Sequence, residues 1–283
     1  MTRPIRIAAQ IPPAGTPSYS AWRDAILRAE DIGADAIFGY DHFMVPAVTG
    51  RDENGRPVTA PNPPVRSNFE SWTALASWAE ITSRAELGLL VGGAGFRNPD
   101  LLADMARTVD HISGGRIILG LGAGWYQPDY TEYSYDFGAV SSRHALFVDA
   151  LERIQDRLTK LVPPPLRKIP VLIGGGGEKK TLRMVAQYAQ ACNLFGGPDL
   201  AHKLEVLRGH CDALGRDYDE IEKTVMFPID PGENGENVDS ILEKLREFAA
   251  LGVSHAHSRC PAKNTIPAIE LIGERIIPEA EKF

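Results

Sequence analysis

Short apolar runs alternate with segments of helical periodicity along nearly the whole of this 283-residue chain. The alternation gives eight strand–helix units, and no long polar linker separates them. Apolar runs that alternate with helices are typical of parallel strands whose faces are covered by helices. The runs that we expect to form strands are residues 5–11, 36–39, 87–91, 116–121, 171–173, 191–195, 223–229 and 253–257.

Eight such units in a chain of this length predict an α/β fold, a single (β/α)8 TIM barrel that forms one domain over residues 1–283. An open doubly wound sheet is the alternative that the same alternation allows. In a barrel, the loops after the C-terminal ends of the strands build the active site. The expected helices are residues 22–32, 71–81, 100–111, 142–161, 179–190, 200–214, 238–251 and a last helix from residue 266.

The composition indicates which binding partners to exclude and which cellular compartment to expect. The 30 basic and 37 acidic side chains give a formal charge of −7 without a block of Lys or Arg, which argues against nucleic acid or an anionic membrane as a partner. No apolar run approaches the roughly 18 residues of a spanning helix, and the first residues do not resemble a signal peptide. Cys192, Cys211 and Cys260 form no CxxC pair, so we expect reduced thiols in a cytoplasmic protein.

Two irregular segments follow expected strands. Residues 44–68 are rich in Pro, Gly and Asn and have neither a helical nor a strand period. A loop of this length is typical of a functional loop over the barrel mouth, and a surface insertion is the alternative. Residues 122–140 hold six aromatic side chains, among them Trp125 and Tyr126, which predict a wall for a flat ligand or, residue by residue, ordinary packing.

A run of four glycines, residues 174–177, lies between an expected strand and an expected helix. Glycine lets the backbone approach a ligand closely, and the free N–H groups at a helix start attract an anion. Lys179, Lys180 and Arg183 add positive charge nearby, while Glu178 opposes an anion unless it points away. The run therefore predicts a phosphate site, with a tight strand-to-helix turn as the alternative. It lacks the spacing of a Walker loop.

Two more glycine-rich segments, residues 91–95 and 120–124, also follow expected strands. The second lacks the GxGxxG spacing of a dinucleotide-binding fold. Strand ends with so little side-chain volume would let a planar ring lie across the barrel mouth. We therefore expect a large, flat ligand there.

Histidines occur in two informative places. Asp41 and His42 follow the second expected strand, where an acid and an imidazole can accept and donate protons. A structural histidine is the alternative for His42. His255 and His257 alternate on the last expected strand and share one face, so they could bind a metal such as zinc. The sequence signals no third ligand, so we expect no metal site.

Several short motifs occur in an order that is typical of one enzyme superfamily. They are Asp41-His42-Phe43, Arg97-Asn98-Pro99, Asp110-His111-Ile112-Ser113-Gly114-Gly115-Arg116, Leu119-Gly120-Leu121-Gly122-Ala123-Gly124-Trp125, Ile173-Gly174-Gly175-Gly176-Gly177, His210-Cys211 and Gly215-Arg216-Asp217. Together they resemble the luciferase-like monooxygenase superfamily, and within it the oxidoreductases that use coenzyme F420, a deazaflavin. The resemblance runs from about Ile5 to about His257 and implies a luciferase-like TIM barrel.

The resemblance implies a role for individual residues. Asp41 would contact the deazaflavin ring, and His42 would be the catalytic residue near its reactive carbon. The ring edge would lie on the end of the third strand, where the family often has a bulge with a cis peptide. The phosphate of the cofactor would rest on the glycine run. The cofactor-binding residues implied in this way are Asp41, Leu90, Val91, Gly92, Gly175, Gly176, Gly177 and Thr181.

The sequence also departs from the family pattern. Relatives commonly have a glutamate shortly after the tryptophan that corresponds to Trp125, where this chain has Gln127-Pro128-Asp129. The insertion that usually precedes the glycine-run strand is nearly absent, leaving residues 162–169, so we expect a more open substrate pocket. We expect Arg97-Asn98-Pro99 and residues 111–116 to brace the third helix.

The leading hypothesis is an F420-dependent oxidoreductase that moves a hydride between the deazaflavin and a small organic substrate. His42 would handle the proton, and Trp125, Tyr126 and residues 44–68 would line the substrate side. An FMN-dependent flavin monooxygenase is the alternative within the superfamily. A metal-dependent hydrolase centred on His255 and His257, and a cofactor-binding protein without catalysis, are further alternatives. Family members often form dimers, so the resemblance makes a homodimer one option, and the sequence leaves the oligomeric state open.

Overall fold

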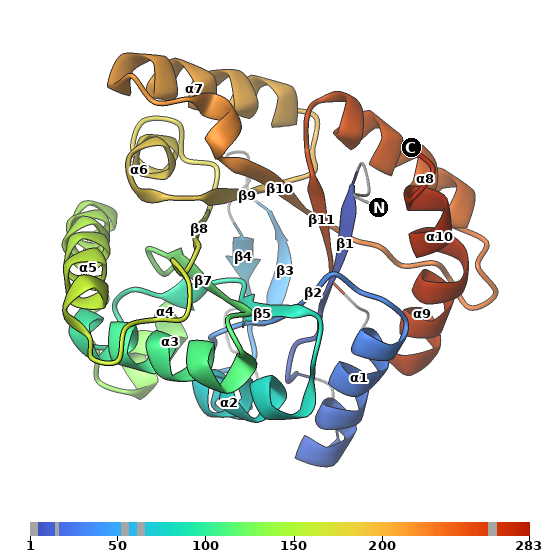
Figure 1. The fold of residues 1–283 in the computed structure, drawn as a ribbon, viewed down its shortest axis with the longest axis horizontal. Helices are drawn as coiled ribbons and strands as arrows, with labels where there is room; N and C mark the ends of the chain where they lie inside the picture. The colour runs from blue at the N-terminus through green and yellow to red at the C-terminus, as the bar shows by residue number, and fades with distance from the viewer. Residues whose placement is uncertain (1–4, 15–16, 52–56, 61–65, 260–264) are drawn as a thin grey trace.

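Eight parallel strands close into a barrel in the computed structural model, which describes residues 5–14, 17–51, 57–60, 66–259 and 265–283 (Figure 1). The pairing of Leu87 with Ile117 joins β5 to β7 and closes the sheet. This confirms the (β/α)8 fold, and the open doubly wound sheet is wrong. The barrel strands are β1 (Arg6–Gln10), β2 (Ala36–Gly39), β5 (Glu86–Leu89), β7 (Ile117–Gly122), β8 (Val171–Gly174), β9 (Ala191–Phe195), β10 (Glu222–Phe227) and β11 (His255–Arg259).

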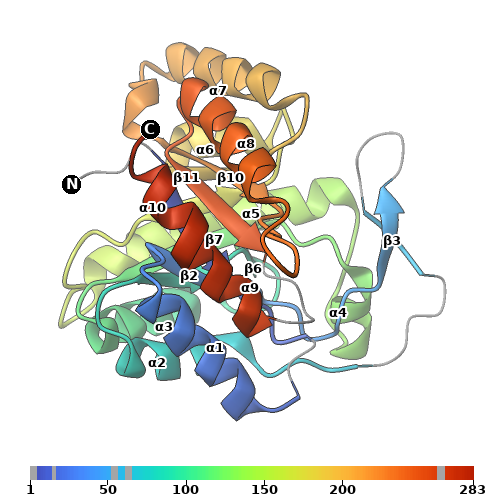
Figure 2. The ribbon, with the colours of Figure 1, turned by 90° about the vertical axis from the view of Figure 1, so that its right-hand side faces the viewer.

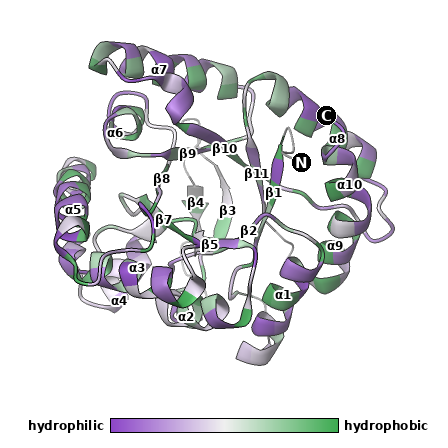
Figure 3. Cartoon of the chain, in the orientation of Figure 1, coloured by the Kyte–Doolittle hydropathy of each residue, from purple (hydrophilic) through white to green (hydrophobic). Residues whose placement is uncertain are grey.

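Helices surround the barrel and cover its outer face (Figure 1). Along a single helix, hydrophilic and hydrophobic residues alternate, as expected for helices with one face on a sheet and one in solvent (Figure 3). The helices are α1 (Tyr19–Asp31), α2 (Ser71–Ile81), α3 (Pro99–Ser113), α5 (Val140–Lys160), α6 (Thr181–Tyr188), α7 (Leu200–Leu214), α8 (Val238–Ala250), α9 (Thr265–Leu271) and α10 (Ile277–Ala280), with a 3-10 turn η1 (Tyr218–Glu220) and a π-helical turn η2 (Ile272–Ile276).

Two hydrophobic layers stabilise this arrangement. The larger layer lies between strands and helices and includes the fully buried indoles of Trp22 and Trp78, whose rings meet edge to face at 4.7 Å. The smaller layer fills the barrel interior. Its members are Ala8, Ala36, Phe38, Leu90, Ile118, Leu172 and Ala191. A packed interior leaves the two ends of the barrel as the places where a ligand can bind.

Helix α3 shows the bracing that the sequence predicts. The Asn98 side chain accepts hydrogen bonds from the first backbone N–H groups of the helix and caps it. The helix ends at Gly114, whose φ of 68° is left-handed. Arg116 then donates to the backbone carbonyls of Ala79, Thr82 and Ala85, which ties α2 to the start of β5 and β7.

The irregular segments contain structure that the sequence analysis missed. In residues 44–68, β3 (Val48–Arg51) pairs antiparallel with β4 (Pro57–Thr59), although residues 52–56 and 61–65 lie outside the described part of the chain. In residues 122–140, α4 (Gln127–Glu132) forms, with Pro128 in its first turn. Both strands of the hairpin are too short for a period-2 pattern to stand out. Figure 2 shows β3 and α4 at the end of the barrel away from the C-terminus.

The cysteines that the structure describes, Cys192 and Cys211, are buried and unpaired with one another, as expected for structural thiols. Burial raises the pKa of Cys192 to about 12, so its thiol stays protonated and unreactive. Cys260 lies outside the described residues. Within the described residues, no helix combines the length and the apolar character that crossing a lipid bilayer requires.

Candidate active site

The predicted ring-binding residues gather at the C-terminal ends of β2, β5 and β7. Asp41 and His42 follow β2 directly. The short strand β6 (Gly92–Gly93) continues the line of β5 and pairs with the end of β7. Helix α4 and the β3–β4 hairpin lie beyond this end of the barrel (Figure 2). The site therefore occupies the end at which TIM-barrel active sites are built.

His42 is held by a buried carboxylate that the sequence analysis did not single out. The Nδ1 atom of His42 lies 2.6 Å from Oδ2 of Asp129, which is fully buried in α4. The other oxygen of Asp129 accepts a hydrogen bond from the backbone N–H of Met44 at 2.8 Å. The two partners are 87 residues apart in sequence. The available sequence signal was the acidic residue Asp129 itself, in the stretch after Trp125 where relatives commonly have a glutamate.

Aromatic edges surround the His42 ring on its remaining sides. The rings of Tyr40, Trp125 and Tyr126 lie at centroid distances of 5.2, 5.4 and 5.6 Å and are all steeply inclined to the imidazole. Trp125 is 40% exposed, so it can contact a substrate as predicted. Tyr126 is 2% exposed, so its ring packs against His42 and does not face the solvent.

Asp41 lies in a buried ion-pair network. Arg97 donates to both Asp41 oxygens, at 2.5 and 3.0 Å, and also to Glu70 at 2.6 Å. Glu70 in turn caps α2 by accepting from the N–H of Thr73. Burial raises the pKa of Asp41 although Arg97 opposes this shift. The sequence analysis expected Arg97 to brace α3. Its side chain instead pairs with Asp41 in the candidate site.

The peptide bond between Leu90 and Val91 is cis, at the strand end where the family resemblance implies it. The carbonyl oxygen of Leu90 accepts a buried hydrogen bond from the Gln10 side chain at 2.9 Å. The Val91 side chain points toward the glycines that end β7 and β8. A Cβ atom on Gly122 or Gly174 would approach the Val91 methyl groups to 2.8 and 2.9 Å.

These glycines therefore have a packing role that the sequence analysis did not foresee. A Cβ atom on Gly120 would lie 2.0 Å from the carbonyl oxygen of Leu89, so only glycine fits between β5 and β7. A Cβ on Gly93 would lie 2.5 Å from the Phe96 ring. The strand ends lack side chains because neighbouring groups fill the space, and Val91 forms the surface on which a flat ligand would lie.

The aromatic side chains of residues 122–140 divide between surface and packing. Tyr130 is buried and packs against Phe96 at 4.9 Å and Phe137 at 5.0 Å. Its hydroxyl points at the backbone of Gly124, where a Cβ would lie 1.9 Å away. Burial raises the pKa of Tyr130 to about 12. Of the predicted aromatic wall, Trp125 is the member that lies beside His42 and is exposed.

The glycine run after β8 has the features of an anion site. Gly175 has a φ of 119°, a conformation that favours glycine. Within the described part of the chain, the backbone N–H groups of Gly176 and Gly177 have no protein hydrogen-bond acceptor. The Thr181 hydroxyl would lie 2.8 Å from a Cβ on Gly177. Two free N–H groups and a hydroxyl thus lie together at the start of α6.

The cation nearest this turn comes from a helix that the sequence analysis did not connect with it. The Lys203 side chain, from α7, would lie 3.8 Å from a Cβ on Gly176. Its Nζ is 2.5 Å from the Glu178 carboxylate, and this ion pair lowers the pKa of Glu178. Lys179 and Lys180, which the sequence suggested, are exposed. Helical periodicity alone could not show that α7 places Lys203 against the turn.

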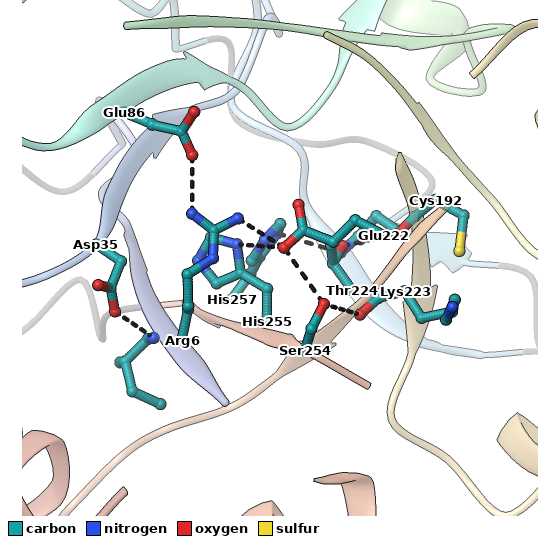
Figure 4. Close-up of polar contacts among 12 residues, drawn as sticks. Arg6, Asp35, Glu86, Cys192, Glu222, Lys223, Thr224, Ser254, His255 and His257 are labelled. Carbon is teal, nitrogen blue, oxygen red and sulfur yellow. Dashed lines mark hydrogen bonds and ion pairs between the residues drawn. The ribbon is translucent and has the colours of Figure 1, made fainter. Parts of the chain in front are cut away.

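His255 and His257 lie at the opposite, N-terminal end of the barrel (Figure 4). They line a cavity of about 310 Å³ with Arg6, whose guanidinium pairs with Glu86 and Glu222 at 2.8 and 2.6 Å. Burial and the charge of Arg6 lower the pKa of His257 to about 3. Across the described residues, no three His, Cys, Asp or Glu side chains converge to bind a metal.

A comparison of the sequence with known protein families identifies the family of this chain. The sequence profile described as luciferase-like monooxygenase matches residues 4–265. The chain belongs to the luciferase-like monooxygenase family. Membership places it among oxidoreductases, and it agrees with the position of the cis peptide and the glycine run.

Two relatives illustrate the chemistry within this luciferase-like family. A phthiodiolone/phenolphthiodiolone dimycocerosates ketoreductase of Mycobacterium tuberculosis is 30% identical over 254 residues, which cover 82% of this chain and 66% of the relative. The chain thus spans slightly less than two thirds of that protein. A 4-hydroxyprotoasukamycin monooxygenase of Streptomyces nodosus is 26% identical over 289 residues, which cover 92% of this chain and 73% of the relative.

Solved structures of the luciferase-like fold superpose over the whole chain. An F420-dependent secondary alcohol dehydrogenase, in complex with an F420–acetone adduct, matches with a TM-score of 0.78 and 14% identity, covering 99% of both chains. At this identity the likeness shows the fold. The F420-dependent dehydrogenase thus shares the barrel fold of this chain, and the ketoreductase and the monooxygenase resemble it in sequence.

Proposed function

We propose that this protein is an F420-dependent oxidoreductase that transfers a hydride between the deazaflavin and a small alcohol or carbonyl substrate. The observation that carries the proposal is the position of His42 beside a barrel end whose strand ends at β6, β7 and β8 are glycines, with Val91 between them. Such a surface accepts a flat tricyclic ring, and one imidazole stands next to it. Both the ketoreductase relative and the alcohol dehydrogenase neighbour support a carbonyl or alcohol substrate.

The residues fit the cofactor at both of its ends. The free N–H groups of Gly176 and Gly177, the Thr181 hydroxyl and Lys203 would hold the phosphate. Val91 and Gly92 would support the ring, whose polar edge would lie near the Asp41 carboxylate. When bound, the deazaflavin supplies the hydride acceptor or donor.

His42 would move the proton that accompanies the hydride. Among the residues that the structure describes, its Nε2 has no protein partner, and the side chain is 18% exposed. The Nε2 atom can therefore accept the hydroxyl proton of an alcohol or donate a proton to a carbonyl oxygen. Trp125 and the base of the β3–β4 hairpin would shield the reacting groups from water.

An FMN-dependent monooxygenase is the second candidate, because the family profile and the monooxygenase relative favour it. The charge at the glycine run argues for the deazaflavin. Glu178 places a carboxylate beside the turn, which is less compatible with a phosphate monoester of almost two charges than with a phosphodiester of one. FMN carries the monoester and F420 the diester.

Titration of the purified protein with oxidised F420 and with FMN, followed by absorption and fluorescence, tests the proposal. We expect saturable binding of F420 and at least tenfold weaker binding of FMN. Preference for FMN would replace the proposal by the second candidate, and binding of neither cofactor would reject both.

A further inference from the structure

The Asp129 carboxylate links two parts of the barrel mouth that are distant in sequence. One oxygen lies 2.6 Å from Nδ1 of His42, and the other accepts from the backbone N–H of Met44 at 2.8 Å. The carboxylate is fully buried, so water does not compete for either oxygen. Both acceptor atoms are therefore committed to the two residues that begin the segment after β2.

This geometry selects one form of the His42 ring. A carboxylate beside Nδ1 accepts a hydrogen bond from an Nδ1–H group, so the neutral imidazole carries its hydrogen on Nδ1. The Nε2 atom then has a free lone pair, and among the described residues no protein group bonds to it. The steep edges of Tyr40, Trp125 and Tyr126 restrict rotation of the ring about its bond to Cβ. The position of His42 after β2 predicts neither the tautomer nor the restricted rotation of its ring.

We propose that Asp129 is the positioning residue that fixes the tautomer and the orientation of His42. The inference rests on the proposed function, in which His42 moves the substrate proton. With Nε2 unprotonated, His42 accepts the hydroxyl proton of an alcohol as the hydride leaves the adjacent carbon, and the alcohol becomes a carbonyl compound. In the reverse direction the doubly protonated ring returns that proton to the carbonyl oxygen. The Asp129 carboxylate, 2.6 Å from Nδ1, lies where it balances the charge that the ring gains.

The hydrogen bonds around the segment base extend this role to the hairpin. Asn68 donates to the carbonyl oxygen of His42 at 2.8 Å, and its own N–H donates to the carbonyl of Phe43. Together with the Met44 bond to Asp129, these contacts fix both ends of residues 44–68 to the catalytic histidine. The hairpin and the ring are thus positioned by one shared set of hydrogen bonds.

The decisive experiment is nitrogen–proton correlation NMR on protein labelled with 15N-histidine, recorded without cofactor. His42→Gln assigns the His42 signals by their loss. In the wild-type protein at neutral pH we expect the Nδ1–H tautomer of His42. In Asp129→Asn we expect a mixture with the Nε2–H tautomer, because an amide can also donate to Nδ1. Asp136→Asn is the matched control: this exposed aspartate after α4 accepts, among the described residues, from the N–H of Gly138, and its replacement leaves the His42 signals unchanged.

A kinetic arm separates positioning from a purely structural role. Asp129→Asn is expected to lower kcat on the order of 100-fold or more, with KM and the cofactor Kd changed less than about threefold. A wild-type Nε2–H tautomer overturns the inference even if the variant does not fold. An unchanged tautomer in folded Asp129→Asn overturns it too. Failure of both cofactors to bind would reject the proposed function. The NMR result would still show whether Asp129 fixes the His42 tautomer, because it is recorded without cofactor.

Discussion

Arg97 donates one hydrogen bond to each oxygen of the Asp41 carboxylate, at 2.5 and 3.0 Å, in a site where the Asp41 side chain is 1% exposed. The same guanidinium reaches Glu70, which caps α2. The bidentate contact therefore joins the end of β2, the start of α3 and the start of α2 through a single cation. Such a pair contributes little when intact but is costly to break, because the remaining charge stays buried.

Replacement Arg97→Met should lower the free energy of unfolding by about 3–5 kcal/mol, since Asp41 loses the cation that offsets its burial. Urea denaturation followed by circular dichroism measures the change. Arg153→Met removes a surface pair with Asp100, 40% and 47% exposed, and should change the free energy of unfolding little, because solvent screens this pair. Equal losses in the two variants would contradict the network as described.

His42→Ala should reduce turnover of a working substrate by about 10²–10⁴-fold while the cofactor still binds, because the ring moves a proton and does not hold the phosphate. Steady-state kinetics and the F420 titration check the two halves of this expectation. His144→Ala is the matched control, since that half-buried histidine, among the described residues, makes its side-chain hydrogen bond to the carbonyl of Val140 in its own helix. Turnover that survives in His42→Ala would remove this histidine from the mechanism.

Two glycine substitutions should have opposite effects. Gly120→Ala places a Cβ atom 2.0 Å from the carbonyl oxygen of Leu89, so the barrel must open locally and we expect misfolding or a loss of at least about 3 kcal/mol. Gly209→Ala, in α7, meets nothing within 4 Å and should stabilise the protein by roughly 0.5–1 kcal/mol. Thermal unfolding of both variants tests the pair. A tolerated Gly120→Ala would show that β5 and β7 are not in close contact there.

Acid should weaken the barrel through the histidines at its N-terminal end. The pKa of His257 is lowered to about 3 by burial and by Arg6, and that of His255 is also lowered. The unfolded chain binds these protons near pH 6.5, so stability is present above that pH and falls as the pH drops toward 3.

In the variant His257→Asn, which keeps an acceptor for the Asn193 amide, the decrease in unfolding free energy between pH 7 and pH 5 should be about 2 kcal/mol smaller than in the wild-type protein. Urea titrations at both pH values give the difference. His144→Asn, a change in α5 outside this cavity, is the control and should reproduce the wild-type pH dependence. The same pH dependence in wild type and His257→Asn would contradict the assignment of a neutral, buried imidazole.

Lys203 should contribute to the affinity for the cofactor phosphate. Lys203→Met removes the cation beside Gly176 and should weaken F420 binding about tenfold, whereas Lys180→Met, on the exposed side of the same turn, should change it little. Glu178→Gln removes the opposing carboxylate and should improve binding of FMN more than that of F420. Fluorescence titration of the three variants measures these Kd values. No change in Lys203→Met would place the phosphate elsewhere.

Local periodicity was enough to locate most of the barrel. The expected ranges 36–39, 71–81, 191–195 and 200–214 coincide with β2, α2, β9 and α7. This accuracy has a simple cause, because residues on one face of a helix or strand recur at a fixed spacing that the sequence displays directly. The β3–β4 hairpin escaped notice, since strands of three or four residues are too short to establish a period.

The sequence by itself determined the (β/α)8 barrel, the end of it at which the candidate site was predicted, and candidate residues shortly after a strand, such as His42. Only the tertiary structure decided which side chains from other elements meet them. Asp129 reaches the β2 end from α4, Arg97 reaches it from the turn before α3, and Lys203 reaches the glycine run from α7. Such contacts depend on how helices and loops converge at the barrel end, which a spacing along the chain does not encode. The glycines of β7 and β8 illustrate the same limit, because only the folded barrel shows that Leu89 and Val91 occupy the space that these glycines leave.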